Sequence, residues 1–191
     1  MSDMVYSQGG EQQVILEYFK DFKGNLLDIG ANDGITFSNS RQLIINGWKG
    51  TLVEPSKAFD KLEQLYLESN QVYLINYAIS TYDGEMDWFE SADTLITSNN
   101  EAFTAKWNHP YVKTTKTCRT YNTLFEKNRF HFISIDAEAM DWEILQQIDL
   151  SDTKLLCIEH AHIPDGANKI KNYCIGMNEI YRNGENIILA R

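Results

Sequence analysis

The sequence is short of positive charge, and this shortage argues against a nucleic-acid partner. Its 191 residues include 17 lysines and arginines against 27 aspartates and glutamates, a formal net charge of −10. Phosphate would have to approach an acidic surface against long-range repulsion unless a local basic patch were present. The densest basic stretch, at 113–119, holds two lysines and one arginine and is more typical of an exposed strand. We therefore expect no DNA or RNA partner.

Long apolar runs and a secretory leader are also missing. No stretch approaches the roughly 18–20 consecutive apolar residues of a membrane span. The N-terminal sequence MSDMVYSQGG has neither the basic region nor the apolar region of a signal peptide. These absences predict a cytoplasmic protein with no membrane partner.

Cysteine and proline are scarce. Cys118, Cys157 and Cys174 form no C-x-x-C pair and cannot all pair within the chain. Cys157 lies in an apolar run, which is typical of a buried thiol rather than a nucleophile or ligand. No linker or internal repeat marks a domain boundary, and 43% hydrophobic residues suffice for one core. We expect a single domain over 1–191, with a helical lead-in at 1–23.

Two periodicities alternate along the chain and predict an α/β fold. Ser56 is the expected N-cap of one predicted helix, and the dipeptide Asn183-Gly184 predicts an antiparallel hairpin at 178–190. A turn at Asp83-Gly84 predicts antiparallel or edge structure around 86–89. The β-α-β-α-β order implies a parallel sheet with helices on both faces. The predicted helices lie at 13–20, 38–46, 57–69, around 141–147 and near 170–175, and the predicted strands at 24–30, 50–54, 72–76, 130–136 and 154–159.

The first predicted strand runs into a glycine-bearing loop, DIGANDG at 28–34. In an open α/β sheet, nucleotide-like ligands lie at such a loop, outside the carboxyl ends of the strands. The loop has the spacing G-x-x-x-G and no lysine, so it matches neither the dinucleotide fingerprint G-x-G-x-x-G nor a phosphate-binding loop. Asp33 also makes it a poor match for pyrophosphate. An acidic loop suits a ligand with a positive centre and no phosphate, such as S-adenosylmethionine.

Glu54 supports the same ligand. It ends the second predicted strand, near the place where doubly wound folds position an acid that takes a ribose diol. Three other interpretations stay open. Glu54 can be a solvated strand end, Asp28 can cap the following loop, and Gly30 and Gly34 can serve tight-turn geometry without a ligand.

Short strings spread over almost the whole chain resemble, in order and spacing, the FkbM family of S-adenosylmethionine-dependent methyltransferases. These strings are YSQGGE at 6–11, LDIGANDG at 27–34, FSNS at 37–40, GWKG at 47–50, VEPS at 53–56, NYAIS at 76–80, DGE at 83–85, ISIDAE at 133–138, EIL at 143–145, IEH at 158–160 and ENII at 185–188.

The resemblance implies a Rossmann-like class I methyltransferase fold, with a mostly parallel sheet of about seven strands and a C-terminal antiparallel hairpin. It implies S-adenosylmethionine as cofactor and O-methylation of a hydroxyl on a sugar, glycan or small metabolite. A catalytically inactive domain that binds cofactor or a partner is the alternative, whereas the missing G-x-G-x-x-G disfavours an NAD-dependent oxidoreductase. The implied cofactor-binding residues are Asp28, Gly30, Ala31, Asn32, Gly34, Ser38, Glu54, Pro55, Asn76, Ala78 and Asp136.

An alcohol acceptor must also lose its proton, which requires a base or a metal-bound alkoxide. Asp136 ends one predicted strand and Glu138 follows two residues later, while Glu159, His160 and His162 lie at the end of the next strand. We expect Asp136 to contact the reaction centre or the acceptor, and Glu138 or His160 to act as the base. The alternatives are a helix-capping role for the two acids and a divalent metal held by the histidines with a carboxylate, which is not expected.

The sequence departs from the family pattern at Ala139. The family usually has glycine after its D-x-E string, and we expect the alanine to narrow the space beside the acceptor. Trp88, Trp107 and Trp142 are expected to pack in the core or at sheet edges, with a place in an acceptor cleft as the alternative.

Overall fold

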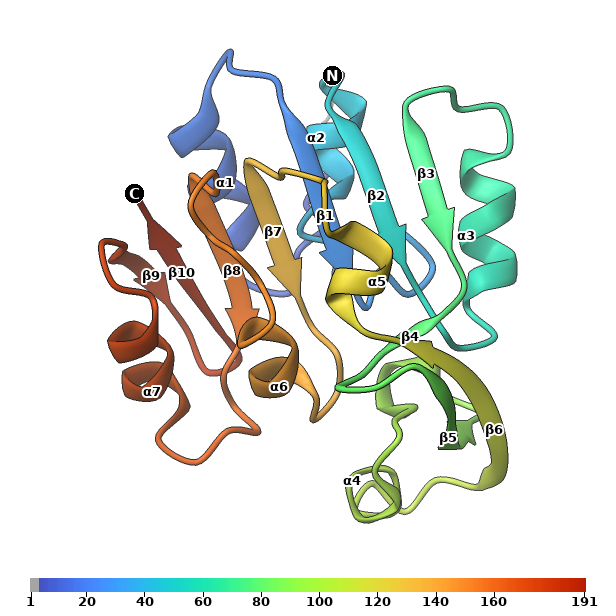
Figure 1. Cartoon of the computed structure of the whole chain (residues 1–191). Helices are drawn as coiled ribbons and strands as arrows, with labels where there is room; N and C mark the ends of the chain where they lie inside the picture. Colours follow the sequence, from blue (N-terminus) through green and yellow to red (C-terminus); the bar gives the residue numbers. More distant parts are fainter. Residues whose placement is uncertain (1–3) are drawn as a thin grey trace.

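A seven-stranded sheet forms the centre of the computed structural model, which describes residues 4–191 (Figure 1). Five neighbouring strands run parallel, and β10 runs antiparallel to both β8 and β9. The mostly parallel sheet with its antiparallel C-terminal hairpin is thus confirmed. In spatial order the strands are β3 (Val72–Ile75), β2 (Lys49–Val53), β1 (Asn25–Ile29), β7 (Phe132–Ile135), β8 (Leu155–Glu159), β10 (Asn186–Ala190) and β9 (Asn178–Arg182).

Helices cover both faces of this sheet, because successive side chains of a strand point to opposite faces. Leu26 and Leu52 pack on one face with the helices α1 (Glu11–Phe19), α2 (Arg41–Ile45) and α3 (Phe59–Tyr66). Leu27 and Val53, each one position further along, pack on the other face. That face is covered by α5 (Tyr121–Phe125), α6 (Asp141–Leu145) and α7 (Gly166–Tyr173).

A second sheet of three strands lies in residues 76–120, between β3 and α5, which we call the inserted segment. It consists of β4 (Ala78–Ile79), β6 (Tyr111–Arg119) and β5 (Gly84–Ser91), in that spatial order. A 3-10 turn, η1 (Thr94–Ile96), and the short helix α4 (Glu101–Ala105) connect β5 to β6. The second sheet lies beyond the carboxyl ends of the main parallel strands (Figure 1). Antiparallel pairing of β5 with β6 confirms the predictions for 86–89 and 113–119.

The segment after β2 differs from its prediction. The expected helix at 57–69 begins at Phe59 with Ala58 at the N-cap, so Ser56 is not its capping residue. The Ser56 hydroxyl instead accepts a hydrogen bond from the Ala58 N–H at 3.1 Å. The backbone N–H of Ser56 donates to Glu54 Oε1 at 2.7 Å. Ser56 therefore shapes the turn that holds the strand-end carboxylate.

Two further observations concern the described residues 4–191. The three cysteines are free and buried, which confirms the interpretation of Cys157 as a buried thiol. No helix in this range has the length and apolar character needed to cross a membrane.

Candidate active site

A cavity of about 480 Å³ lies at the carboxyl ends of the parallel strands, between the main sheet and the inserted segment. This volume is in the range of small-molecule sites. Its walls come from the ends of β1, β2, β7 and β8, from the start of β4, and from the connection between β5 and β6. The cavity therefore lies at the edge where open α/β sheets bind ligands.

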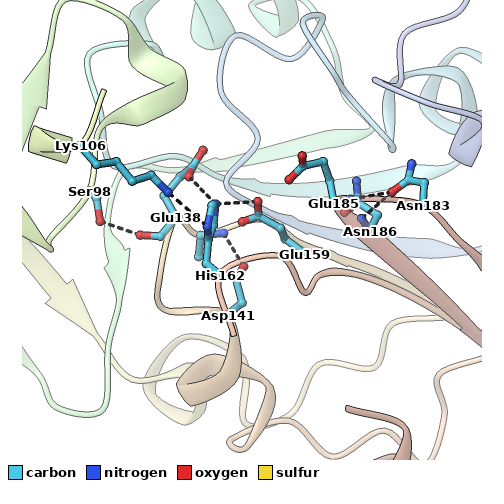
Figure 2. Close-up of polar contacts among 10 residues, drawn as sticks. Ser98, Lys106, Glu138, Asp141, Glu159, His162, Asn183, Glu185 and Asn186 are labelled. Carbon is cyan, nitrogen blue, oxygen red and sulfur yellow. Dashed lines mark hydrogen bonds and ion pairs between the residues drawn. The ribbon is translucent and has the colours of Figure 1, made fainter. Parts of the chain in front are cut away.

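Hydrogen bonds fasten the inserted segment over this edge. The Thr94 hydroxyl donates to Asn32 Oδ1 at 2.8 Å, in the loop after β1. The Ser98 hydroxyl donates to the backbone oxygen of Glu138 at 2.6 Å, after β7 (Figure 2). Residues 93–99 are thus tied to two strand ends, and they form one wall of the cavity.

The loop after β1 packs directly on the end of β7. Gly30 has a φ of +85°, and a Cβ atom at this position would overlap the backbone carbonyl of Asp136. Glycine is required here both for the backbone conformation and for the close approach. This contact brings Asp28 and the loop at 30–34 to the same place as the acids that follow β7.

Glu54 is held rigidly at the end of β2. Its side chain is buried, and its Oε2 accepts a hydrogen bond from the Asn32 N–H at 2.8 Å while Oε1 accepts one from the Ser56 N–H. Burial nevertheless raises the pKa of this carboxyl. Since each carboxylate oxygen has two acceptor positions, one on each oxygen is left for a ligand.

Asp28 is a second buried carboxyl at the cavity. The Ser40 hydroxyl donates to its Oδ2 at 2.5 Å. Burial outweighs this hydrogen bond and raises the pKa of Asp28 to about 6. The ionised form is therefore less favourable in the folded protein than in water.

The carboxylates of Asp136, Glu138, Asp141 and Glu159 gather with His162 where β7 and β8 end. Figure 2 shows Glu138, Asp141, Glu159 and His162 of this cluster. His162 Nε2 lies 2.9 Å from Glu159 Oε1 and 3.9 Å from Glu138 Oε2. The Lys106 ammonium lies 3.4 Å from His162 Nδ1. An ammonium group can only donate, so Nδ1 accepts and Nε2 carries the proton that it donates to Glu159. Burial, followed by the charge of Lys106, lowers the pKa of His162, which agrees with a neutral ring.

The carboxyl groups of this cluster hold protons more tightly than they would in water. Burial, reinforced by the charge of Glu159, raises the pKa of Asp136 well above its usual value. Burial and the charge of Asp136 raise the pKa of Glu138. The pKa of Glu159 rises to about 8, again through burial first. Such a site takes up positive charge, whether as a proton or as a cation.

The family model for the Methyltransferase FkbM domain matches residues 28–181. The chain belongs to the FkbM methyltransferase family. S-adenosylmethionine is accordingly the cofactor of this FkbM protein, as the sequence predicts. A comparison with curated proteins gives no match.

Solved structures share the fold of the FkbM protein at low sequence identity. A Staphylococcus aureus protein described as a caffeoyl-CoA O-methyltransferase aligns with a TM-score of 0.53 at 15% identity, over 98% of this chain and 85% of its own. M. capricolum TrmK, in complex with S-adenosyl-homocysteine, has a TM-score of 0.51 at 9% identity, over 95% of this chain and 68% of its own. The N-terminal domain of human METTL16, also with S-adenosyl-homocysteine, has a TM-score of 0.51 at 10% identity, over 98% and 72%. These matches confirm the class I methyltransferase fold.

The cavity of the FkbM protein fits the chemistry of this cofactor. The buried Glu54 keeps one acceptor position on each oxygen, as a ribose diol requires, and apolar side chains lie beside it. Within residues 4–191, Lys106 is the single lysine or arginine at the cavity, so a pyrophosphate would find little counter-charge. A cationic sulfonium meets the opposite situation. Seven carboxylates line the cavity, namely Asp28, Glu54, Asp93, Asp136, Glu138, Glu159 and Glu185.

Most of the residues implied by the resemblance meet at this cavity, and three do not. Gly34 has a φ of +76° and packs against α3, where a Cβ would lie 2.7 Å from Leu62 Cδ1. Asn76 is exposed and lies outside the cavity. The residues that do line it are Asp28, Gly30, Ala31, Asn32, Ser38, Glu54, Pro55, Ala78, Asp136 and Glu138.

The third exception is His160. Its Nε2 lies 3.1 Å from the backbone oxygen of Asn183, so the ring contacts the C-terminal hairpin and not the cavity. The strand β8 ends at Glu159 and the chain turns at once, so His160 and His162 do not continue the strand. His162 reaches the cavity instead.

Sequence reasoning missed the contribution of the inserted segment. Its cavity residues include Asp93, Leu95 and Lys106, none of which belongs to a recognised motif, and Trp107, which takes the alternative place in a cleft rather than the expected packed one. Trp88 also lines the cavity, whereas Trp142 packs against Tyr173.

Asp33 and Ala139 act differently from their predictions. The carboxylate of Asp33 accepts hydrogen bonds from the N–H groups of Ile35 and Thr36, at 2.9 and 2.7 Å, and does not line the cavity. Ala139 does not line it either, so the expected narrowing beside the acceptor is wrong. Its φ of +89° explains why glycine suits this position, since an alanine is strained there.

Proposed function

We propose that this FkbM protein transfers the methyl group of S-adenosylmethionine to a hydroxyl oxygen of a small, uncharged acceptor, such as a sugar unit or a glycan end. The observation that carries the proposal is the cluster of Glu138, Glu159 and His162 at the cavity. A hydroxyl acceptor needs a group that takes its proton, and this cluster supplies one.

The positions of the acids along the sheet support a division of the cavity. Glu54 follows β2, and the cluster follows β7 and β8, which lie two and three strand spacings away. At about 4.8 Å per spacing these separations are about 10 and 14 Å, comparable to a nucleoside with an amino acid attached. Glu54 would take the ribose diol, with Ala78 and Ile79 beside the adenine. The bound cofactor supplies a methyl group already activated on a sulfonium.

Glu138 is the base that the geometry supports best. Both ring nitrogens of His162 are engaged, one with Lys106 and the other with Glu159. Glu138 Oε2, at 3.9 Å from His162 Nε2, has only a long contact there. Burial raises the pKa of Glu138, so this carboxyl must first lose its proton to act as the base, and the charge of Lys106 favours the ionised form. His162 and Lys106 then orient the carboxylate and the acceptor.

The charges at the cavity favour a neutral acceptor. A phosphorylated or carboxylated acceptor would face seven acidic side chains, ionised or protonated, with Lys106 as the single ammonium at the cavity within the described residues. Trp88 and Trp107 add aromatic surface to the walls. An aromatic face packs well on the apolar C–H face of a sugar ring, while the carboxylates accept bonds from its hydroxyls.

The proposal can be tested with S-adenosylmethionine labelled on its methyl carbon. A panel of neutral hexoses, deoxyhexoses and N-acetylhexosamines is offered beside the phosphates of the same sugars. We expect transfer to neutral members only, and a loss of about 10²- to 10⁴-fold in Glu138→Gln with unchanged S-adenosyl-homocysteine affinity. Preference for the phosphates would contradict the charge argument. Full activity of Glu138→Gln would remove it as the base.

A further inference from the structure

Three carboxylates at the ends of β7 and β8 lie closer together than their charges allow without compensation. Asp136 follows β7, Asp141 begins α6, and Glu159 ends β8. One carboxylate oxygen of each lies within 4.8 Å of one from both others. Asp141 is 1% exposed and Glu159 is 7% exposed. Like charges at this distance repel strongly where water is excluded.

Each of the two buried carboxylates has one oxygen without a partner. Asp141 Oδ1 accepts a hydrogen bond from the Ala137 N–H at 2.7 Å, and Glu159 Oε1 accepts one from His162. Asp141 Oδ2 and Glu159 Oε2 are buried and have no hydrogen-bond partner among residues 4–191. A buried acceptor left in this state costs about 1–3 kcal/mol, and more when it is charged. These two oxygens therefore point to a ligand that the protein chain itself does not supply.

His162 is poorly placed to be part of a metal site. A histidine that binds a metal normally donates its other ring N–H to a carboxylate, carbonyl or water. Here Nδ1 faces the Lys106 ammonium and must accept a hydrogen bond. Nε2 then carries a proton and has no lone pair for a cation. The groups free to bind a cation are thus the carboxylate oxygens.

We propose that Asp136, Asp141 and Glu159 bind one divalent cation of the Mg²⁺ or Mn²⁺ class, with its remaining positions open to the cavity. Sites made of oxygen ligands favour these hard cations over zinc or copper. At bond lengths of about 2.1 Å, oxygens on opposite sides of one ion lie about 4.2 Å apart. The three oxygens lie within 4.8 Å of one another, so side-chain rotation must bring them closer before they share one ion. Two ionised carboxylates would balance the cation, and a third would add a net negative charge.

This site deepens the proposed function and rests on it, because Asp136 and Glu159 line the same cavity as Glu138. A hydroxyl bound to a divalent cation loses its proton more readily. The cation would therefore hold the acceptor oxygen next to the group proposed as its base.

Binding of Mn²⁺ to the metal-stripped full chain tests the site without any acceptor. Electron paramagnetic resonance measures free Mn²⁺, and calorimetry gives the stoichiometry and affinity. We expect one Mn²⁺ per chain, competition by Mg²⁺, and affinity at least 10-fold weaker in Asp141→Asn and Glu159→Gln. Asp93→Asn is the matched control. Asp93 lines the cavity and its side chain caps η1, a role that asparagine retains. This variant should bind Mn²⁺ like the wild type.

Binding of S-adenosyl-homocysteine to the same samples separates the two proposals. If this ligand binds but millimolar Mn²⁺ and Mg²⁺ do not, the metal site is refuted and the methyltransferase proposal survives. If neither binds, both are refuted. Unchanged Mn²⁺ affinity in Asp141→Asn and Glu159→Gln, or a loss in His162→Asn alone, would overturn the ligand set. Should Asp141→Asn fail to fold, the less buried Asp136→Asn takes its place.

Discussion

Replacing Glu54 by glutamine tests the cofactor end of the cavity with one atom exchanged. In the wild type, two backbone N–H groups point at the carboxylate, from Asn32 at 2.8 Å and from Ser56 at 2.7 Å. The amide NH₂ of glutamine must face one of these donors. One buried N–H then loses its acceptor, which should lower the free energy of unfolding by about 1–3 kcal/mol.

The effect on the ligand follows from the same geometry. Hydrogen bonds to a charged group contribute about 1.5–3 kcal/mol. Glutamine at position 54 removes the charge and leaves one neutral acceptor for the ribose diol. We expect the dissociation constant of S-adenosyl-homocysteine to rise by a factor of roughly 10 to 150.

Calorimetry with S-adenosyl-homocysteine measures this change, and circular dichroism confirms that the variant is folded at the temperature used. Glu90→Gln is the matched control. Glu90 also accepts two N–H groups, from Lys57 at 3.2 Å and from the Trp88 indole at 3.0 Å, but it does not line the cavity. The dissociation constant of S-adenosyl-homocysteine for Glu90→Gln should stay within about threefold of the wild-type value. A folded Glu54→Gln variant with unchanged affinity would refute the assignment of the ribose to Glu54.

Three further predictions concern stability and can be measured by urea unfolding. Gly30→Ala should lower the free energy of unfolding by about 3 kcal/mol or more, because the new Cβ would overlap a carbonyl and the φ is positive. Gly184→Ala, which has open space around it, should change the free energy of unfolding by less than about 1 kcal/mol. Ala139→Gly should raise the free energy of unfolding by up to about 1 kcal/mol, since relief of the left-handed backbone strain exceeds the entropy cost of glycine. A less stable variant would contradict the strain at this position. The pKa of Asp28 is about 6 in the folded protein and 3.8 in the unfolded chain. This difference stabilises the folded state below pH 3.8, and the stabilisation is lost as the pH rises through 6. Asp28→Asn lacks this loss, so its free energy of unfolding relative to the wild type should increase by about 2.4 kcal/mol from pH 4 to pH 7, and no change over that range would refute the shift.

The features that sequence predicted well are those with a local physical signal. Strands buried on both faces form short apolar runs, and Asn183-Gly184 marks a hairpin whose turn is held by the Asn183 side chain, which accepts hydrogen bonds from the N–H groups of Glu185 and Asn186. Gly30 and Glu54 stand at the ends of such strands, so the fold itself brings them to one edge. For this reason the sheet, and the place of Gly30 and Glu54 at the cavity, could be anticipated.

The remaining site residues depend on tertiary packing that leaves little trace in the sequence. His160 and His162 could be told apart only by knowing that the chain turns immediately after Glu159. Lys106 reaches the cluster from α4 and its flank, a segment without periodicity or motif. The departure from the family glycine at Ala139 is visible in the sequence, but it affects the backbone conformation rather than the volume of the site.

The most direct test of the account identifies the atom that receives the methyl group. Product is made with ¹³C-methyl S-adenosylmethionine and the neutral sugar that supports the fastest turnover, and its ¹³C NMR spectrum is recorded. We expect one new methyl signal at the position of a methyl ether with the wild type, and no such signal when the reaction is run with Glu138→Gln. A methyl group on nitrogen, sulfur or carbon, or transfer to sugar phosphates with none to neutral sugars, would contradict it.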